Sequence, residues 1–289
     1  MKLVLRKYQA YGNDFLLLPA DKLSEPDWPR FARAVCDRHF GVGADGCIFV
    51  AADGNACSIR IFNCDGSEAG MSGNGSRCAA AFVSQCEKPA SPIVLDTRSG
   101  RKTFQLVDQE VGSWVFRSRL GCPLFAPGDI PCRATGSEVR EYPLEVNGET
   151  LRIHALSMGN PQCAVFCRRA PSDEEFRRWG SALEVHPFFP DRTNVSFVTA
   201  ESPSRLRIKI WERGVGPTLS SGTGSCGAAV AAIRANLAAS PVQVATASGS
   251  QDVIWEGEEV ELIGSVHFVA DVHYHWVDPS HLSLATSPE

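Results

Sequence analysis

Two short loops of this sequence combine small residues in a way that favours anion binding. The first reads Ser72-Gly73-Asn74-Gly75 and the second Ser221-Gly222-Thr223-Gly224, and each directly precedes an Ala-rich stretch. Glycine lets a ligand approach the backbone closely, and a helix N-terminus presents free N–H groups with a partial positive charge. Two such loops facing each other would hold one anion, such as a carboxylate, between two helix ends.

The side chains that begin the two loops, Ser72 and Ser221, would then flank a bound molecule on opposite faces. An enzyme that inverts a stereocentre needs this layout, because one group removes a proton and the other returns one from the far side. Either loop alone is better explained as an ordinary helix-entry turn. The matched pair favours a site.

The two loops belong to an internal repeat that spans half of the chain. The repeated landmarks keep their order at offsets of 147 to 149 residues: Gly12-Asn13-Asp14 with Gly159-Asn160-Pro161, Phe49-Val50 with Phe197-Val198, Phe62-Asn63 with Trp211-Glu212, and the first loop with the second. Four landmarks in the same order are hard to obtain by chance. The sequence therefore predicts two copies of one β-rich unit, each with a central helix.

Short β-rich segments separated by Gly, Asp, Asn and Pro supply the framework for these loops. The clearest lie at 47–50, 58–62, 196–199, 206–211 and 260–263. Helices are expected in four places: 26–38, 76–86, the segment after Ser172, which forms a capping box with Glu175, and 226–238.

The predicted fold class is α+β, with two pseudo-symmetric domains that are each a barrel-like β unit around a central helix. The first domain comprises 1–117 together with 265–289, and the second comprises 118–264. The Pro- and Gly-rich stretch 121–131 is the candidate boundary between them. The segment from about Ser265 has no counterpart in the repeat and is expected to return to the first domain.

The composition excludes several classes of protein. The 289 residues are 44% hydrophobic and 21% charged with a net charge of −5, which fits a globular protein of about two domains. An acidic chain lacks the basic face that nucleic acid requires, and no apolar stretch approaches the roughly 20 residues of a membrane span. Eleven cysteines without a secreted framework are expected to be reduced. The sequence thus predicts a cytoplasmic protein that binds neither nucleic acid nor membrane.

Two segments fit the G-x-G-x-x-G spacing of a dinucleotide site, at 41–46 and 222–227. That site requires a strand, then the glycines, then a helix, with an acidic residue about 20 positions later. The first segment precedes a strand, and the second lacks the acidic residue. No dinucleotide cofactor is therefore expected.

Cysteine and histidine pairs raise the alternatives of a metal site and a thiol nucleophile. Cys163 with Cys167, or His273 with His275, could chelate a metal, but no second pair has the spacing of a zinc site. Cys78 and Cys226 lie at or near the predicted helix starts, where a small buried thiol is the better explanation. No metal is expected.

Eight segments along nearly the whole chain resemble the diaminopimelate epimerase family. They are Tyr11-Gly-Asn-Asp-Phe15, Asp37-Arg-His-Phe-Gly-Val-Gly-Ala-Asp-Gly46, Arg60-Ile-Phe-Asn-Cys-Asp-Gly-Ser-Glu68, Ser72-Gly-Asn-Gly-Ser-Arg-Cys78, Ser157-Met-Gly-Asn-Pro161, Arg192-Thr-Asn-Val195, Trp211-Glu-Arg-Gly-Val-Gly216 and Ser221-Gly-Thr-Gly224. The resemblance implies a cofactor-free epimerase of LL- and meso-diaminopimelate, serving lysine and cell-wall synthesis. The implied partner is this small amino-acid substrate, with a homodimer as an open assembly state.

The family uses two cysteines for the proton transfers, and the matching positions here hold Ser72 and Ser221. A thiol has a pKa of about 8.5, whereas the pKa of an alcohol lies much nearer the value of about 15.7 for water. Gln162 and Pro217 also depart from the family pattern, which usually has His and Glu there. Natural divergence and deliberate removal of the catalytic pair both account for the serines. Three functions stay open: an epimerase, an inactive or very slow variant that still binds diaminopimelate, and a racemase of another amino acid.

Amide, carboxylate and guanidinium side chains at the matched positions suit an amino-acid ligand. Asparagine amides would bind ammonium and carboxylate groups, Glu212 could accept from an ammonium, and Arg213 offers a planar fork to a carboxylate. The resemblance places the distal, non-reacting end of the substrate at Asn63, Asn194 and Arg213. The substrate-binding residues expected are Asn13, Asn63, Gly73, Asn74, Asn160, Asn194, Glu212, Arg213, Gly222 and Thr223, with Ser72 and Ser221 as the proton-transfer pair.

Overall fold

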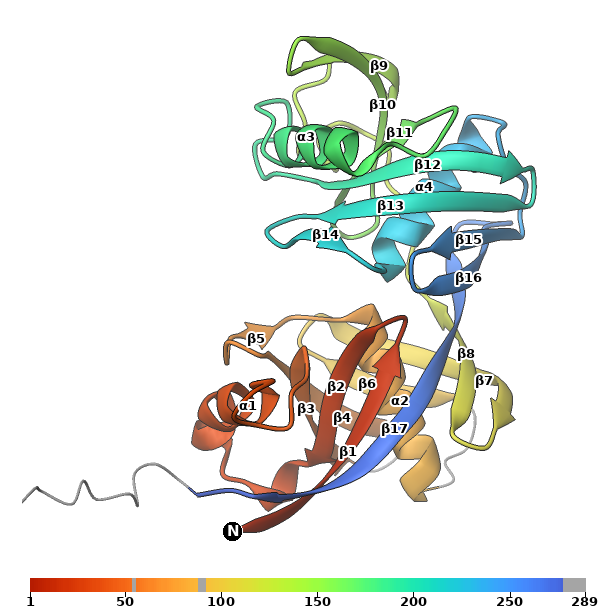
Figure 1. The fold of residues 1–289 in the computed structure, drawn as a ribbon. Helices are drawn as coiled ribbons and strands as arrows, with labels where there is room; N and C mark the ends of the chain where they lie inside the picture. The colour runs from red at the N-terminus through yellow and green to blue at the C-terminus, as the bar shows by residue number, and fades with distance from the viewer. Residues whose placement is uncertain (54–55, 88–91, 278–289) are drawn as a thin grey trace, which may run out of the picture.

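The chain forms two β-rich halves that lie one above the other in Figure 1. A computed structural model describes residues 1–53, 56–87 and 92–277. The first half contains β1 (Lys2–Ala10), β2 (Asn13–Pro19), α1 (Trp28–Cys36), β3 (Gly46–Asp53), β4 (Ala56–Asn63), β5 (Glu68–Ala69), α2 (Gly73–Glu87), β6 (Ile93–Thr97), β7 (Gly100–Glu110) and β8 (Ser113–Arg119), with 3-10 turns at Ala20–Lys22 and Glu25–Asp27.

The second half repeats this order of elements. It contains β9 (Val139–Val146), β10 (Glu149–Ser157), β11 (Pro161–Phe166), α3 (Asp173–Glu184), β12 (Asn194–Ser202), β13 (Arg205–Glu212), β14 (Gly216–Thr218), α4 (Gly222–Arg234), β15 (Val242–Thr246) and β16 (Gly249–Ile254), and the described chain ends with β17 (Glu261–His275).

The strand pairing confirms the repeat that the sequence predicts. In each half a parallel pair is followed by an antiparallel hairpin, so that β2, β3 and β4 correspond to β11, β12 and β13. The register also matches, because Phe62 pairs with Glu68 in the first half and Trp211 pairs with Pro217 in the second. The two halves are therefore equivalent residue by residue around the predicted loops.

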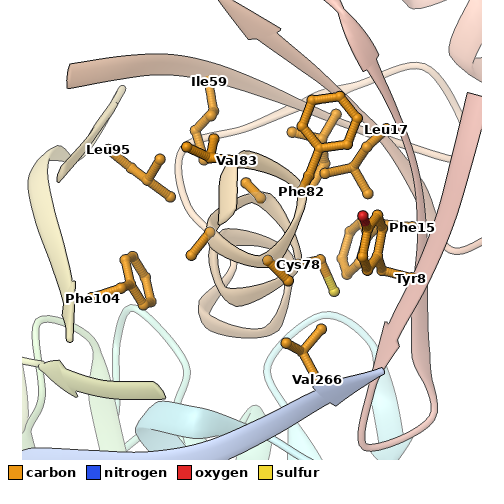
Figure 2. Packing of buried hydrophobic residues seen from close by; sticks show 14 of the residues in the cluster. Tyr8, Phe15, Leu17, Ile59, Cys78, Phe82, Val83, Leu95, Phe104 and Val266 are labelled. Carbon is orange, nitrogen blue, oxygen red and sulfur yellow. The ribbon is translucent and has the colours of Figure 1, made fainter. Parts of the chain in front are cut away.

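An Ala-rich helix fills the centre of each half. Figure 2 shows α2 surrounded by side chains from the strands, among them Tyr8, Phe104 and Val266. The alanines of α2 that face this core are fully buried, and α4 is buried on nearly all of its faces. A helix that is apolar all round belongs inside a core, and its small side chains let the surrounding strands pack closely. The helices α1 and α3 pack against separate clusters of buried residues.

The four predicted helices are present, but two begin earlier than expected. The predicted starts at 76 and 226 were wrong, because α2 begins at Gly73 and α4 at Gly222. Glycine disfavours a helix interior, but a serine cap and free N–H groups suit the first turn of these two helices. At α3 the capping box is confirmed: the Glu175 N–H donates to Ser172 Oγ at 3.2 Å, and the Ser172 N–H donates to Glu175 Oε2 at 2.7 Å.

Strand β17 connects the two halves. It pairs with β16 of the second half near Glu261, with β8 over residues 261–267, and with β1 from His267 to His275. From Ser265 onward this strand pairs with β8 and β1 of the first half. In Figure 1 the blue strand runs from the upper half along the lower one. Residues 278–289 of the predicted first domain lie outside the described residues.

None of the helices in the described residues is long and apolar enough to cross a membrane. Ten of the eleven cysteines have side chains that the structure describes, and all ten are free thiols.

Candidate active site

Ser72 caps the N-terminus of α2. Its Oγ accepts a hydrogen bond from the Gly75 N–H at 3.0 Å, and its carbonyl accepts from the Ser76 N–H at 2.8 Å. A Cβ on Gly75 would lie 3.2 Å from Ser72 Oγ and from the ring of Phe15, so glycine allows this close approach. Within the described residues, the N–H groups of Gly73 and Asn74 have no acceptor, which leaves two donors of the first turn for a ligand.

Ser221 caps α4 in the same way. Its Oγ accepts from the Gly224 N–H at 3.3 Å, and its carbonyl accepts from the Ser225 N–H at 2.9 Å. A Cβ on Gly224 would lie 3.1 Å from the Ser221 Cβ. In the described chain the N–H groups of Gly222 and Thr223 likewise have no acceptor. Each half therefore offers one hydroxyl and a pair of backbone donors at a helix N-terminus.

The two helices meet at the junction of the halves. Helices α2 and α4 contact each other, and a Cβ on Gly12 would lie 3.1 Å from the side chain of Leu219, two residues before Ser221. The Tyr11 hydroxyl links the halves further, because it accepts from the Ser265 N–H at 2.9 Å and donates to the Ser250 carbonyl at 3.0 Å. The helices that follow the two loops are thus in contact at the junction of the halves.

Arg77 is a buried cation at this junction that sequence reasoning missed. Its side chain is only 1% exposed, it donates to Asn74 Oδ1, and it lies 5.6 Å from the centre of the Tyr11 ring. No ion pair to Arg77 exists among the described residues, and burial lowers the pKa of its guanidinium. The positive charge of Arg77 also acts on Cys226 across the junction. An arginine so placed adds to the positive potential of the two helix ends.

Asn160 joins the second loop through side-chain hydrogen bonds. Its amide donates to Thr223 Oγ1 at 3.4 Å and accepts from Gln162 Nε2 at 2.7 Å. Gln162 is buried against α4, where a Cβ on Gly227 would lie 2.9 Å from its side chain. This chain of amides fixes the first turn of α4 relative to β11.

Asn194 and Arg213, two of the residues expected to bind substrate, lie together. Asn194 is buried, donates to the Pro161 carbonyl at 2.9 Å, and accepts from the Arg213 N–H at 3.0 Å. Arg213 is exposed and uses one nitrogen on the Asp191 carbonyl, so the rest of its fork is available to a ligand. Glu184, which sequence reasoning missed, holds the next turn by accepting from the Gly214 N–H at 2.8 Å.

In the first half, Asn13 and Asn63 both contact the segment Asp45-Gly46. Asn13 donates to Asp45 Oδ2 at 2.7 Å, while Asn63 pairs with Gly46 across β3 and β4 and donates to Ser67 Oγ at 2.9 Å. Asp45 in turn accepts from Arg38 at 2.9 Å. The resemblance segment around residues 37–46 therefore positions the two asparagines.

Glu212 is a half-buried carboxyl group at the end of β13. Burial raises its pKa above the ordinary value, because water that would stabilise the carboxylate is excluded. A nearby ammonium group would reverse this effect, which fits the expected role of Glu212 in binding a substrate amine.

Cys78 and Cys226 are both fully buried, as expected for small thiols at these helix starts. Burial raises the pKa of Cys226 to about 12, and it raises the pKa of Cys78 further still. Thiols with such values stay protonated near neutral pH. The described residues contain no group of three or more metal-ligating side chains.

A family model for diaminopimelate epimerase matches residues 5–116 and 154–269 of this chain. The chain belongs to the diaminopimelate epimerase family. A diaminopimelate epimerase of a Synechococcus strain is 40% identical over 264 residues, covering 88% of this chain and 91% of that relative. The diaminopimelate epimerase of Pelotomaculum thermopropionicum is 37% identical over 273 residues, covering 93% and 97%.

Solved structures share the fold with this member of the diaminopimelate epimerase family. A phenazine biosynthesis protein of the PhzF family from Bacillus anthracis superposes with a TM-score of 0.67 at 18% identity, covering 96% of this chain and all of that one. A hydroxyproline epimerase from Agrobacterium vitis gives a TM-score of 0.61 at 15% identity, covering 94% and 91%. These likenesses confirm the predicted two-domain, barrel-like α+β architecture.

Proposed function

We propose that this protein interconverts LL- and meso-diaminopimelate by proton transfer at the α-carbon, without a cofactor. Membership of the family supports this reaction, and the paired loops at the helix ends carry the argument for the site. Each half contributes one hydroxyl and two unpaired N–H groups at the junction.

The reacting carboxylate of the substrate lies between the N-termini of α2 and α4 in this proposal. The N–H groups of Gly73 and Asn74, with those of Gly222 and Thr223, donate to it. An α-proton becomes acidic when negative charge that develops on the adjacent carboxylate is stabilised, and donors fixed before the reaction stabilise that charge without reorganisation. Arg77 supports the same charge from one helical turn further along α2.

Ser72 and Ser221 are assigned as the two proton-transfer groups, one on each face of the α-carbon. The remaining site residues bind the rest of the substrate: Asn13 and Asn160 lie beside the loops, and Glu212 accepts from an ammonium. Asn63, Asn194 and Arg213 hold the distal amino-acid end. The free part of the Arg213 fork supports this assignment.

Deuterium incorporation tests the reaction directly. The full chain is incubated with LL-diaminopimelate in D₂O, and α-deuterium and the meso product are followed by NMR. We expect both to form, at a rate limited by the serine pair. Arg213→Met should weaken binding of the substrate by about tenfold, because a charge-assisted pair is lost, whereas the exposed control Ser204→Ala should not.

Calorimetric titration of diaminopimelate separates the alternatives. Binding without deuterium exchange would establish a binding protein of this fold and refute the proposed turnover. Exchange into another amino acid, with no binding of diaminopimelate, would establish a racemase of different specificity.

The cellular setting proposed is the cytoplasm, where free thiols such as the ten described here stay reduced. The domain division proposed from the sequence, 1–117 with 265–289 and 118–264, is supported by the pairing of β17 with β1. A homodimer is the proposed assembly, and light scattering of the purified chain tests it.

A further inference from the structure

A cavity of about 320 Å³ lies in the second half, and its lining includes no residue of the two loops at 72–75 and 221–224. It opens between α3 and the strands β12, β13 and β14, which Figure 1 shows in the upper half. Phe176 and Phe197 supply apolar walls, and Lys209 supplies positive charge, whereas Arg207 is paired with Glu201 at 2.6 Å. The volume suits a small organic molecule.

The internal repeat identifies the residues of the first half that correspond to the lining of this cavity. Arg60, the counterpart of Lys209, lies 5.5 Å from the centre of the Trp28 ring, and Lys209 lies 5.6 Å from the centre of the Phe176 ring. Arg60 also pairs with Glu25 on the rim, as Lys209 pairs with Asp173 at 2.9 Å. The cation, its aromatic neighbour and its outer carboxylate are thus repeated.

An inner ion pair of the first half is missing from the second. Glu68 accepts from Arg60 Nη2 at 2.9 Å and from Arg98 Nη1 at 3.0 Å. The strand register makes Pro217 the counterpart of Glu68 and Ala247 the counterpart of Arg98. Both Pro217 and Ala247 line the cavity. The cavity therefore lies where two long charged side chains have been replaced by short apolar ones.

Lys209 has one N–H donor that no protein acceptor in the described residues uses. An ammonium group has three N–H donors, and Lys209 uses one on Asp173 and one on the Pro171 carbonyl, both at 2.9 Å. Arg60, in the same place, binds two carboxylates. The apolar walls and the third N–H donor of Lys209 together indicate a ligand with an apolar body and one carboxylate.

We propose that this cavity is an accessory site for a small aryl or alkyl carboxylate. The carboxylate of the ligand lies against Lys209, in the position that Glu68 takes beside Arg60, and its apolar body lies against Phe176 and Phe197. The site is separate from the one proposed for diaminopimelate. Leu219 lines it as well, so a bound ligand contacts the segment that leads into Ser221.

Benzoate and its neutral analogue benzamide provide the test, in calorimetric titrations of the full chain with saturating diaminopimelate present. We expect benzoate to bind about tenfold more tightly than benzamide, because the charged group gains a charge-assisted pair with Lys209. Lys209→Met should weaken benzoate binding by about tenfold and leave benzamide unchanged. Lys102→Met, a lysine outside the cavity, serves as the matched control.

Pro217→Glu is the complementary variant, since it restores the carboxylate of the first half. We expect this variant to lose benzoate binding and to melt at a temperature equal to or above that of the parent, which shows that it folds. Equal affinity for benzoate and benzamide, unchanged benzoate affinity in Lys209→Met, or no benzoate binding by the parent would each overturn the proposal.

Discussion

Replacing both site serines with cysteine should raise the epimerase rate by about three to four orders of magnitude. The structure provides the environment for this change, because each Oγ already accepts one helix N–H, at 3.0 Å for Ser72 and 3.3 Å for Ser221. A thiolate in the same place would meet the same donors. The helix end stabilises a negative charge by about 0.3–1 kcal/mol, so a thiol pKa of about 8.5 falls to about 8.

The magnitude follows from base strength. The pKa of an alcohol is about 15, so roughly seven pKa units separate a serine hydroxyl from a cysteine thiol at this site. The fraction ionised near neutral pH therefore differs by about 10⁷. The rare alkoxide is the stronger base and therefore reacts faster. With a Brønsted coefficient of about 0.5, its greater base strength recovers about half of these seven orders of magnitude in rate. A gain of about 10³ to 10⁴ remains. Both changes are needed, because the two groups act in turn as base and acid.

The assay measures inversion and α-deuterium exchange for the parent, Ser72→Cys, Ser221→Cys and the double variant, after calorimetry shows that each binds diaminopimelate. Each single variant should exchange the α-proton of one stereoisomer without efficient inversion. If the parent is as fast as the double variant, the argument from thiol acidity is wrong. Glu212, the half-buried carboxyl group of the site, would then be the next base to test.

Three further variants test the junction and the site. Tyr11→Phe should lower the free energy of unfolding by about 2–4 kcal/mol in urea titrations, because the Ser265 N–H and the Ser250 carbonyl both lose their partner; an unchanged midpoint would contradict this. Glu212→Gln should stabilise the protein above about pH 5 but not near pH 4: a carboxyl whose folded pKa is raised contributes stability that is lost as pH rises, and glutamine removes that loss. Melting curves at both pH values check it, and equal shifts would count against burial as the cause. Arg77→Met should weaken diaminopimelate binding by about tenfold with little change in melting temperature, because a buried cation contributes to potential more than to stability; a large fall in melting temperature with unchanged affinity would reverse that assignment.

Local sequence signals predicted the helix starts well where a residue type has a single well-defined role, such as capping a helix. The capping box at Ser172 and Glu175 is such a case, and the spacing of the two glycine loops is another. The predicted starts of α2 and α4 were late because helix propensity counts against glycine, whereas an N-terminal turn that binds an anion tolerates it.

Features that depend on tertiary contacts carry no local signal. Arg77 reads in sequence as an ordinary helix residue, and only the packing of the two halves shows that it is buried. Glu184 likewise ends a helix in sequence, yet it holds the Gly214 turn of another segment. The cavity beside Lys209 emerges only when the strand register aligns Pro217 with Glu68. Pattern reading thus located the two serine-capped helix starts, whereas the residues that pack around them come from segments far apart in the chain.

The position of β17 has a consequence for synthesis on the ribosome. The core of the first half includes Val266, and the edge of β1 is covered by residues 267–275. Roughly 140 residues separate β8 from β17, which at translation speeds of about 5–20 residues per second is a delay of about 7–28 s. During that interval the emerged first half lacks its closing strand and exposes an unpaired edge, which favours pairing with other chains. The last strand of the described chain thus completes the half that is made first, and a nascent chain that stalls before Glu261 leaves a partly folded product for chaperones and proteases.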